Sequence, residues 1–248
     1  MIFFEVMQGK VTPYKDSALS KKNQVAAMFN NIAWRYDFLN HFLSFGVDRY
    51  WRSKAISQLK KSSPKIILDV ATGTGDLAIA SLKLNPEKVF GVDISSDMVE
   101  IGKRKIQKKN LQQKIELIEA DSESLIFDDN KFDAITVGFG VRNFENLEKG
   151  LKEMYRVLKP GGTAVILEFS KPKNAVINSL YHFYSERICP LIGKIISKDK
   201  AAYSYLHESV EAFPEGNNFL TIFSEAGFKN ATCKPLTFGV VSIYTGNK

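Results

Sequence analysis

A glycine-rich turn between an apolar run and a helical segment is the first stretch whose residue types suggest chemistry. The run Lys65–Val70 leads into Asp69-Val70-Ala71-Thr72-Gly73-Thr74-Gly75-Asp76, and a helical pattern follows at once. Glycines let the backbone approach a ligand closely, and the start of a helix offers unpaired N–H groups. We therefore expect Gly73 and Gly75 to lie against a bound nucleotide-like molecule.

Two further acids follow apolar runs later in the chain. Asp93 ends the run Val89–Asp93, about twenty residues after the glycines, where a carboxylate accepts hydrogen bonds from the hydroxyls of an adenosine ribose. Asp121 follows the run Ile115–Ala120, and we expect an acid at this strand end to contact the amino group of an adenine. The alternative for Asp121 is a solvated acid at a strand end.

The charge of the glycine turn separates two classes of ligand. Gly73-Thr74-Gly75-Asp76-Leu77-Ala78 also fits the dinucleotide pattern G-x-G-x-x-G/A, which keeps an NAD-dependent oxidoreductase as an alternative. A pyrophosphate would meet Asp69 and Asp76, and like charges repel. S-adenosylmethionine carries an ammonium and a sulfonium group, so carboxylates favour it. Asp69 is expected to bind the ammonium group, or to cap N–H groups of its own turn.

These residues need a parallel sheet to bring them together. Apolar runs alternate with helical segments from residue 65 to 170, which predicts an α/β fold with helices on both faces of a mostly parallel sheet. Strands are expected at 65–70, 89–93, 115–120, 132–137 and 163–169, with helices at 76–84, 95–108 and 147–158. Two last runs, 229–233 and 240–244, predict a hairpin that completes seven strands and puts one antiparallel strand at the edge.

Two flanking segments are expected to cover the site. Residues 17–59 have a helical pattern broken at Ser44-Phe45-Gly46, which predicts a helical N-terminal cap. Residues 172–214 are rich in aromatics and follow the fifth strand, which predicts an inserted cap over the substrate, with ordinary packing helices as the alternative. With a core over 65–170 and a last helix and strands over 215–248, residues 1–248 are predicted to form one domain.

Composition limits the classes of partner. The chain has 248 residues and a formal charge of +7, which suits nucleic acid, an anionic membrane, an acidic ligand or simply a lysine-rich surface. The basic run Lys103–Lys109 lacks interleaved aromatics, so we expect no nucleic-acid partner. Two cysteines and three scattered histidines predict no metal site. No apolar run is long enough to span a bilayer, so we expect a cytoplasmic protein, and a place at the inner membrane face stays open.

Four longer motifs resemble one family. Two of them resemble the two signatures of the ubiquinone/menaquinone biosynthesis C-methyltransferases. They are Arg156-Val157-Leu158-Lys159-Pro160-Gly161-Gly162-Thr163-Ala164-Val165-Ile166-Leu167-Glu168-Phe169-Ser170 and Tyr36-Asp37-Phe38-Leu39-Asn40-His41-Phe42-Leu43-Ser44. Residues 138–143 and 203–209 also match family patterns, and the resemblance runs from about Lys21 to Tyr244. Asp48 and Gly138 depart from it, where the family usually has histidine and serine.

The resemblance implies a Rossmann-like class I methyltransferase. It implies that Thr74, Asp93 and Asp121 bind S-adenosylmethionine, with Ser122 beside the adenine. It also implies a prenylated quinol substrate, with conversion of demethylmenaquinol to menaquinol favoured by analogy within the family. The equivalent benzoquinol step, or methylation of another small phenol or lipid, is the alternative.

Methylation of a ring carbon needs a neighbouring phenol to lose its proton. Arg142 follows the fourth strand and is expected to stabilise the phenolate and hold a proton-carrying water, or else to form a surface ion pair. Asn143 is expected to orient a ring hydroxyl. Tyr36 is expected to close the site or to pack in the core, and Glu168 to have a structural role. The cap at 172–214 is expected to hold the apolar tail and, with the positive charge, to rest on an anionic membrane; a homodimer is left open.

Overall fold

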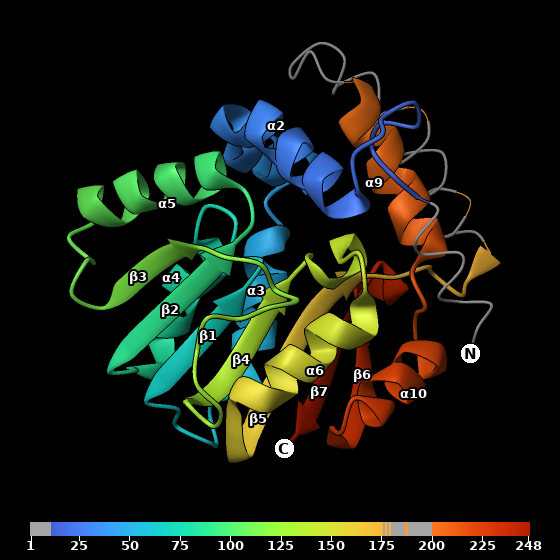
Figure 1. Ribbon diagram of the computed structural model, residues 1–248. Coiled ribbons are helices and arrows are strands. Elements are labelled where there is room, and N and C mark those ends of the chain that lie inside the picture. Colours follow the sequence, from blue (N-terminus) through green and yellow to red (C-terminus); the bar gives the residue numbers. More distant parts are fainter. Residues whose placement is uncertain (1–10, 176, 178, 180–186, 188–199) are drawn as a thin grey trace.

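A computed structural model describes residues 11–175, 177, 179, 187 and 200–248 of the chain (Figure 1). Its centre is a seven-stranded sheet with the strand order β3-β2-β1-β4-β5-β7-β6. The strands are β1 (Ile66–Val70), β2 (Lys88–Asp93), β3 (Ile115–Glu119), β4 (Phe132–Gly138), β5 (Leu158–Phe169), β6 (Lys229–Leu236) and β7 (Val241–Asn247). The first five strands are parallel, so their carboxyl ends share one edge.

Helices cover both faces of this sheet, as the alternating pattern predicts. Helices α3 (Asp48–Ser57), α4 (Asp76–Ser81) and α5 (Ser96–Lys108) pack on one face, and α6 (Leu147–Val157) and α10 (Asn217–Glu225) pack on the other. Successive side chains of a strand point to opposite faces of the sheet. Ile67 therefore lies in the core under α3, α4 and α5, and Leu68 lies in the core under α6 and α10. Strand β1 is covered on both faces, and its residues are therefore apolar except for Asp69.

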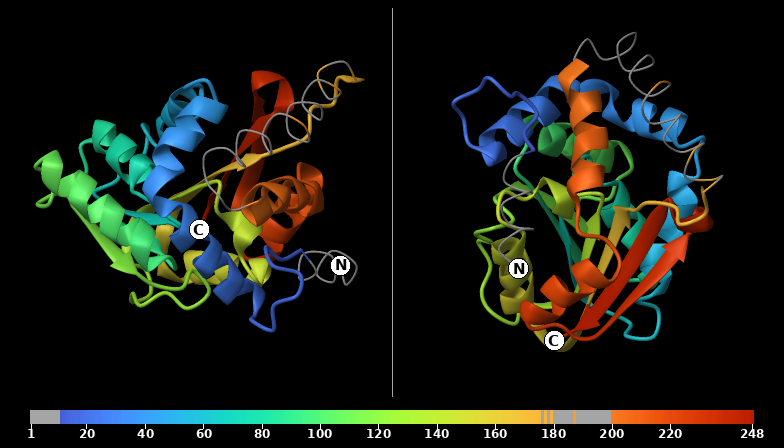
Figure 2. Two further views of the ribbon diagram at one scale, coloured as in Figure 1. Left: turned by 90° about the horizontal axis from the view of Figure 1, so that it is seen from above. Right: turned by 90° about the vertical axis from the view of Figure 1, so that its right-hand side faces the viewer.

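A further layer lies across the carboxyl ends of the strands. It consists of α2 (Lys21–Leu43) and α9 (Lys200–Ala212), which Figures 1 and 2 show on the same side of the sheet. Val25, Met28 and Ile32 of α2 share a small core with Met98 of α5 and Tyr205 of α9. This layer closes the edge where the predicted site residues lie.

The helical N-terminal segment divides into two helices with different partners. The break at residues 44–47 is confirmed, and Phe45 and Gly46 there have positive φ angles. Helix α2 lies over the strand ends, whereas α3 packs on the face of the sheet against β5. Within the expected inserted cap, α9 is described, but the apolar residues 181, 183, 184, 188, 191, 192, 195 and 196 lie outside the described residues.

The prediction of an antiparallel strand at the edge is wrong. β7 runs antiparallel to β5 and lies between β5 and β6, so the reversed strand is second from the edge. Burial explains the order, because Val241–Tyr244 is a run of buried side chains whereas β6 is largely exposed. Lysines and Pro235 suit an edge strand, since they discourage pairing with another chain.

The fifth strand also begins earlier than the sequence predicts. α6 ends at Val157 and β5 starts at Leu158, so Pro160-Gly161-Gly162 lies inside the strand instead of ahead of it. The backbone N–H of Gly161 donates to the carbonyl of Lys248, and the N–H of Lys248 donates to the carbonyl of Gly162. Gly161 has φ +77°, which explains why a glycine is needed there.

Candidate functional site

Asp93 organises the junction between β1, β2 and α5. Its carboxylate accepts hydrogen bonds from the backbone N–H of Gly73 at 2.7 Å and of Ser95 at 2.9 Å. Burial raises the pKa of Asp93, while these two N–H donors oppose that rise. The acid therefore fixes the glycine turn and stays at the end of β2, as the spacing predicts.

A pocket lies at this edge and brings most of the predicted residues together. Gly73, Asp93, Asp121 and Ser122 line it, because β1, β2 and β3 end side by side. The side chains of Tyr36 from α2 and Asn143 from the segment after β4 also reach it. We call this the acidic pocket, since its lining holds four carboxylates and one ammonium group: Asp93, Asp121, Glu123, Glu145 and Lys22.

The charge of the acidic pocket selects the kind of ligand. Lys22 Nζ lies 2.5 Å from Asp121 Oδ2 and 3.4 Å from Glu123 Oε2, so the one cation is already paired. Asp93 and Glu145 add further negative charge. A pyrophosphate would be repelled here, whereas a cationic nucleoside is favoured. The residues present therefore fit S-adenosylmethionine better than a dinucleotide.

Three predicted residues lie behind the acidic pocket and do not line it. Asp69 is fully buried and accepts hydrogen bonds from the hydroxyls of Thr72 and Thr136, each at 2.6 Å. Burial raises its pKa to about 6, although these hydroxyls oppose the rise. These partners are hydroxyls, one in the turn and one on β4, and not the backbone N–H groups that the alternative expected Asp69 to cap. Binding of the ammonium group by Asp69 stays a prediction.

Thr74 and Gly75 shape the turn from behind. Thr74 Oγ1 donates to Asp37 Oδ1 at 2.5 Å and accepts from Lys105 Nζ at 2.9 Å, which links the turn to α2 and α5. Gly75 has φ +84° at the start of α4, a conformation that favours glycine. Both residues hold the conformation of the turn whose residues Ala71 and Gly73 line the acidic pocket.

A second, apolar cavity adjoins the acidic pocket. It has a volume of about 470 Å³ and lies between α2, α3 and α9 and the ends of β4 and β5. Trp51, Phe139 and Phe169 form an aromatic wall, with ring centroids 4.5 to 6.3 Å apart. Phe29, Tyr36, Phe139 and Asn143 line both the cavity and the acidic pocket, so the two spaces meet there.

Arg142 lies at the inner end of the apolar cavity. Its side chain is 7% exposed and its Nη1 lies 2.8 Å from Oε1 of Glu168, which is fully buried. Nη1 also donates to the carbonyl of Phe139. The alternative of a surface ion pair is therefore wrong, whereas the structural role expected of Glu168 matches its contacts. Burial raises the pKa of Glu168, and the Arg142 charge opposes that rise.

Three buried polar atoms beside this ion pair have no hydrogen-bond partner in the described part of the chain. They are Arg142 Nε, Asn143 Oδ1 and Tyr205 Oη. Buried polar atoms are nearly always bonded, so an unpaired group of this kind marks a place where a ligand or water supplies the partner. All three residues line the apolar cavity. Together they offer two donors and an acceptor, since a tyrosine hydroxyl also donates.

The N-terminus of α2 holds the loop that carries these residues. Lys21 Nζ donates to the carbonyls of Phe144 at 2.9 Å and Arg142 at 3.3 Å. Burial lowers the pKa of Lys21 to about 8. Glu123 accepts from the N–H groups of Glu145 and Asn146, which fixes the same loop from its other end. These are positioning contacts that the motifs did not predict.

The two departures from the family pattern have structural explanations. Asp48 joins the α2–α3 turn, where its carboxylate contacts His41 Nδ1 at 2.7 Å, Ser44 Oγ at 2.9 Å and Arg52. Although burial opposes it, these partners lower the pKa of Asp48. Gly138 lines the acidic pocket, and an added Cβ would lie 3.1 Å from Leu77. A larger residue there would press on α4.

Tyr205 and Lys22 are two further residues of the site that sequence reasoning missed. Tyr205 belongs to the matched motif at 203–209, but nothing in that motif says that its hydroxyl is buried. Lys22 precedes the first signature, and its side chain contacts Asp121, which is 99 residues further along the chain. Only the folded arrangement brings either of them to the site.

Comparison with known proteins identifies the chain. A parallel sheet with this strand order, a glycine turn after β1 and a carboxylate at the end of β2 define a class I methyltransferase. A structure described as a putative S-adenosyl-L-methionine-dependent methyltransferase from Methanococcus maripaludis has the same fold, with a TM-score of 0.61 and 21% identity over 87% of this chain and 91% of that one.

The chain belongs to the ubiE/COQ5 methyltransferase family, whose sequence pattern matches residues 17–248. It is 49% identical over 242 residues to the demethylmenaquinone methyltransferase of Bacteroides fragilis, covering 97% of this chain and 98% of that protein. It is 46% identical over 230 residues to the ubiquinone/menaquinone biosynthesis C-methyltransferase UbiE of Geotalea daltonii, covering 92% and 97%. The chain is therefore a methyltransferase, and the resemblance seen in its motifs is confirmed.

Proposed function

We propose that this protein transfers a methyl group from S-adenosylmethionine to a ring carbon of demethylmenaquinol. The observation that carries the proposal is the junction of an acidic pocket with an apolar cavity that holds unpaired buried polar atoms. The names of relatives such as the Bacteroides fragilis enzyme support the same reaction. A benzoquinol is the second candidate, because the Geotalea daltonii relative carries both quinones in its name.

The acidic pocket is proposed to hold the methyl donor. Asp93 would accept from the ribose hydroxyls, Asp121 and Ser122 would contact the adenine, and the backbone at Gly73 would lie against the amino-acid end. When bound, S-adenosylmethionine supplies an electrophilic methyl group on a positively charged sulfur. The carboxylates Asp93, Asp121, Glu123 and Glu145 favour that positive charge in the ground state.

The apolar cavity is proposed to hold the quinol. Its aromatic wall of Trp51, Phe139 and Phe169 suits a flat ring, and its volume leaves room for the first part of an isoprenoid tail. Tyr36 and Asn143 stand where the two spaces meet, so the ring carbon would face the methyl group there. Alignment in a cleft that excludes water supplies much of such a rate enhancement.

Arg142, Asn143 and Tyr205 are proposed to bind the ring oxygens. Arg142 Nε donates a hydrogen bond to the phenolate, whose charge makes the neighbouring ring carbon nucleophilic. Arginine does not act as a base in proteins, so the phenolic proton passes to a water held beside it. As the ring carbon takes the methyl group, the methyl–sulfur bond would break to leave a neutral thioether, and the hydrogen of that ring carbon would leave as a proton to water when the ring becomes aromatic again. Glu168 keeps the guanidinium in one orientation and compensates its charge when the quinol is absent. Tyr205 Oη and Asn143 Oδ1 hold the second ring oxygen.

Binding of the donor tests the first half of the proposal. Asp93→Asn keeps the size of the side chain but removes its charge and one of the two acceptors for the Gly73 and Ser95 N–H groups, and we expect the dissociation constant of S-adenosylmethionine to rise about a hundredfold in calorimetric titration. Glu119→Gln is the matched control, because Glu119 pairs with Asp93 in the sheet register and is exposed. Equal binding by the wild type and both variants would remove the proposed donor site.

Product analysis tests the second half. The protein is supplied with methyl-labelled donor and either demethylmenaquinol or the corresponding demethylated benzoquinol. We expect label in a ring carbon of the naphthoquinol. Label only in the benzoquinol would favour the second candidate, and label in neither would overturn the quinol assignment.

A further inference from the structure

Exposed aromatic side chains gather on one region of this molecule. Among the described residues, eight large apolar side chains are exposed, and six of them are aromatic. Four of those six lie on α2 and the turn that follows it, and we call them the aromatic face: Trp34, Phe38, Phe42 and Phe45. Tyr50 follows in α3, so the concentration is a property of one segment of chain.

The spacing of the aromatic face makes α2 apolar on two sides. Trp34, Phe38 and Phe42 are four residues apart, so they lie on one face of the helix, and the rings of Phe38 and Phe42 stack at 5.8 Å. Val25, Met28, Ile32 and Leu39 are buried on an adjacent side of the helix. Exposed rings beside a buried apolar side form a patch of the kind that marks an interaction surface. Figure 1 shows α2 at the outer surface of the molecule.

Within residues 30–54, the charged side chains that are not paired inside the described chain are all basic. Asp37 and Asp48 are the acids between residues 30 and 54, and both are bound inward, Asp37 by Lys105 and Asp48 by His41 and Arg52. Arg35, Arg49 and Lys54 form no ion pair with the rest of the described chain. The Arg35 guanidinium lies 3.7 Å from the centre of the Trp34 ring, and Lys54 Nζ lies 5.4 Å from that of Tyr50.

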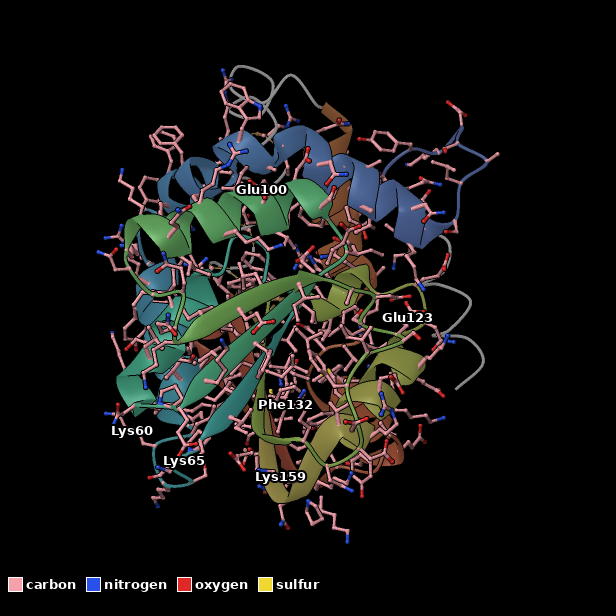
Figure 3. All side chains as sticks on the ribbon, turned by 60° about the vertical axis from the view of Figure 1, so that its left-hand side comes forward. Lys60, Lys65, Glu100, Glu123, Phe132 and Lys159 are labelled. Carbon is pink, nitrogen blue, oxygen red and sulfur yellow. The ribbon has the colours of Figure 1, made fainter. Side chains whose placement is uncertain are left out.

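The opposite end of the sheet offers a contrast. Figure 3 shows Lys60, Lys65 and Lys159 at the far end of the molecule from α2. Two of these lysines are paired, Lys65 with Glu87 at 3.5 Å and Lys159 with Asp133 at 2.6 Å. None of the eight exposed apolar side chains belongs to that end of β1 or β5. Exposed rings and unpaired cations occur together around α2, whereas that end of the described sheet has no exposed large apolar side chain.

The aromatic face is continuous with the apolar cavity. Phe45 is 83% exposed and also lines the cavity, as do its neighbours Leu43 and Ser44. The cavity consequently reaches the surface at the end of the aromatic face. A molecule whose tail lies in the cavity would leave the protein at this point.

We propose that the aromatic face docks on the headgroup region of an anionic lipid bilayer, with Arg35, Arg49 and Lys54 against the lipid phosphates. Aromatic rings with basic side chains beside them are favoured at a membrane interface, because the rings enter its apolar boundary and the cations meet its negative surface. Docking brings the opening at Phe45 to the lipid surface. Delivery of the quinol through that opening rests on the proposed function, whereas docking itself does not.

A second copy of the chain fits this surface less well. A symmetric pair would bring the same patch of each copy together, so Arg35, Arg49 and Lys54 would face cations of their own kind. An anionic membrane offers the opposite charge to all three. The sign of the charge therefore favours lipid over a homodimer at the aromatic face.

Vesicle binding by surface variants tests the proposal without donor or quinol. Co-sedimentation is measured with vesicles of phosphatidylcholine alone and with added phosphatidylglycerol. We expect binding to the mixed vesicles only, and at least about tenfold weaker partitioning for the double variant Phe38→Ser/Phe42→Ser. The control Leu19→Ser/Ile126→Ser removes two apolar side chains that are 54% and 64% exposed, against 60% and 50% for the pair tested, and should change partitioning by less than about twofold.

A charge-matched pair of variants tests the cations separately. Arg49→Glu/Lys54→Glu should weaken partitioning roughly tenfold or more, because each cation near an anionic surface contributes to binding. Lys103→Glu/Lys108→Glu on α5 changes the net charge equally and should have a much smaller effect. Equal losses in both pairs would show that only net charge matters, and would overturn the docking surface.

Activity and oligomeric state complete the test. Phe38 and Phe42 line neither the acidic pocket nor the apolar cavity, so the Phe38→Ser/Phe42→Ser variant should keep its rate on a water-soluble, short-tailed quinol. A wild type that ignores anionic vesicles overturns docking even if it methylates that quinol. A dimer in light scattering that this variant converts to monomer assigns the face to a second copy and also overturns it.

Discussion

Arg142 commits Nη1 to Glu168 and to the Phe139 carbonyl, while its Nε has no partner in the described chain. Tyr205 Oη and Asn143 Oδ1 are left in the same condition. An unpaired polar atom costs stability when it is buried, so a fold that keeps three together holds them for a purpose other than its own stability. This contrast between stability and activity can be measured at a single hydroxyl.

Tyr205→Phe should separate the two effects. It removes a buried hydroxyl without a partner, so we expect the free energy of unfolding to stay equal or to rise by up to about 1 kcal/mol. Because the hydroxyl is proposed to bind the quinol, kcat/KM should fall roughly tenfold. The control is Tyr244→Phe, since Tyr244 Oη accepts from the Gly216 N–H at 2.9 Å. That variant should lose about 1 kcal/mol and keep its activity. If Tyr205→Phe lost stability but kept its activity, and Tyr244→Phe lost activity but kept its stability, the proposed role of Tyr205 would be refuted.

Asp69 gives a pH-dependent prediction. Burial raises its pKa from 3.8 to about 6, so the folded protein holds this proton more tightly than the unfolded chain does. Between these values the folded state binds more protons, and the free energy of unfolding falls as the pH rises, by about 3 kcal/mol in total. Asp69→Asn lacks this term. The stability of the wild type minus that of the variant should therefore decrease by about this amount from about pH 4 to about pH 7 in denaturant titrations. A difference that does not change with pH would contradict the buried charge.

Prediction from sequence succeeded for residues whose position depends on the end of a strand. Asp93, Asp121 and Ser122 come together because parallel strands share an edge, which the sequence pattern indicates. Asp69 ends the same kind of run, but its side-chain partner Thr136 lies on β4, 67 residues away. The residues close to Asp69 in the sequence do not indicate a partner so far along the chain. The same holds for Lys22 and Asp121, which are 99 residues apart.

Among the helices, α5 depends on one glycine to reach the turn that it supports. An added Cβ at Gly102 would lie 2.4 Å from Leu117 Cδ1 and 3.1 Å from the backbone of Thr74. The end of a leucine side chain can move, but the backbone of Thr74 is fixed by the turn. Helix α5 thus packs against β3 and the glycine turn at a separation that only glycine permits, and Ser95 caps its start by accepting from the Met98 N–H.

Gly102→Ala should therefore act against helix propensity. Alanine favours a helix over glycine by up to about 1 kcal/mol, whereas crowding a packed contact typically costs about 1–3 kcal/mol. We expect net destabilisation, seen as a lower Tm, and several-fold weaker binding of S-adenosylmethionine because the turn at Thr74 is displaced. Lys103→Ala, one residue along and exposed, is the control for propensity alone. A more stable Gly102→Ala protein would mean that α5 moves away without cost.

The order of the last two strands shows which element-level rule was overlooked. A short connection predicts a hairpin, and that hairpin is present. Which strand of the hairpin joins the sheet depends on burial, and the side chains of Val241–Tyr244, which are all buried and include one polar residue, Ser242, mark β7 as the inner strand. Strand β5 extends to Leu158 because Leu158 pairs with Phe132 of β4 and Lys248 bonds to Gly161 and Gly162, contacts that only the completed sheet supplies.

On the scale of the whole molecule, the layer above the sheet performs several tasks at once. Helix α2 contributes Lys22 to the acidic pocket, Leu39 to the apolar cavity and the aromatic face to the surface. No helix in the described part of the chain is long and apolar enough to cross a membrane. The sequence predicts a helix at α2. It does not say which of the apolar side chains of that helix are buried and which are exposed, because that depends on the helices that pack against it.

Phe29 and Tyr36 project from α2 into both spaces, so donor and acceptor share part of one wall. Heterotropic linkage follows: whatever factor an occupied acceptor site imposes on the affinity for the donor, the donor must impose in return. Titrating S-adenosylhomocysteine with and without a saturating quinone analogue, and then reversing the roles, should close a thermodynamic square with equal ratios that differ from one. Replacing Tyr36 by alanine should bring both ratios toward unity, because a side chain that contacts both ligands would be lost and their binding would be less strongly coupled.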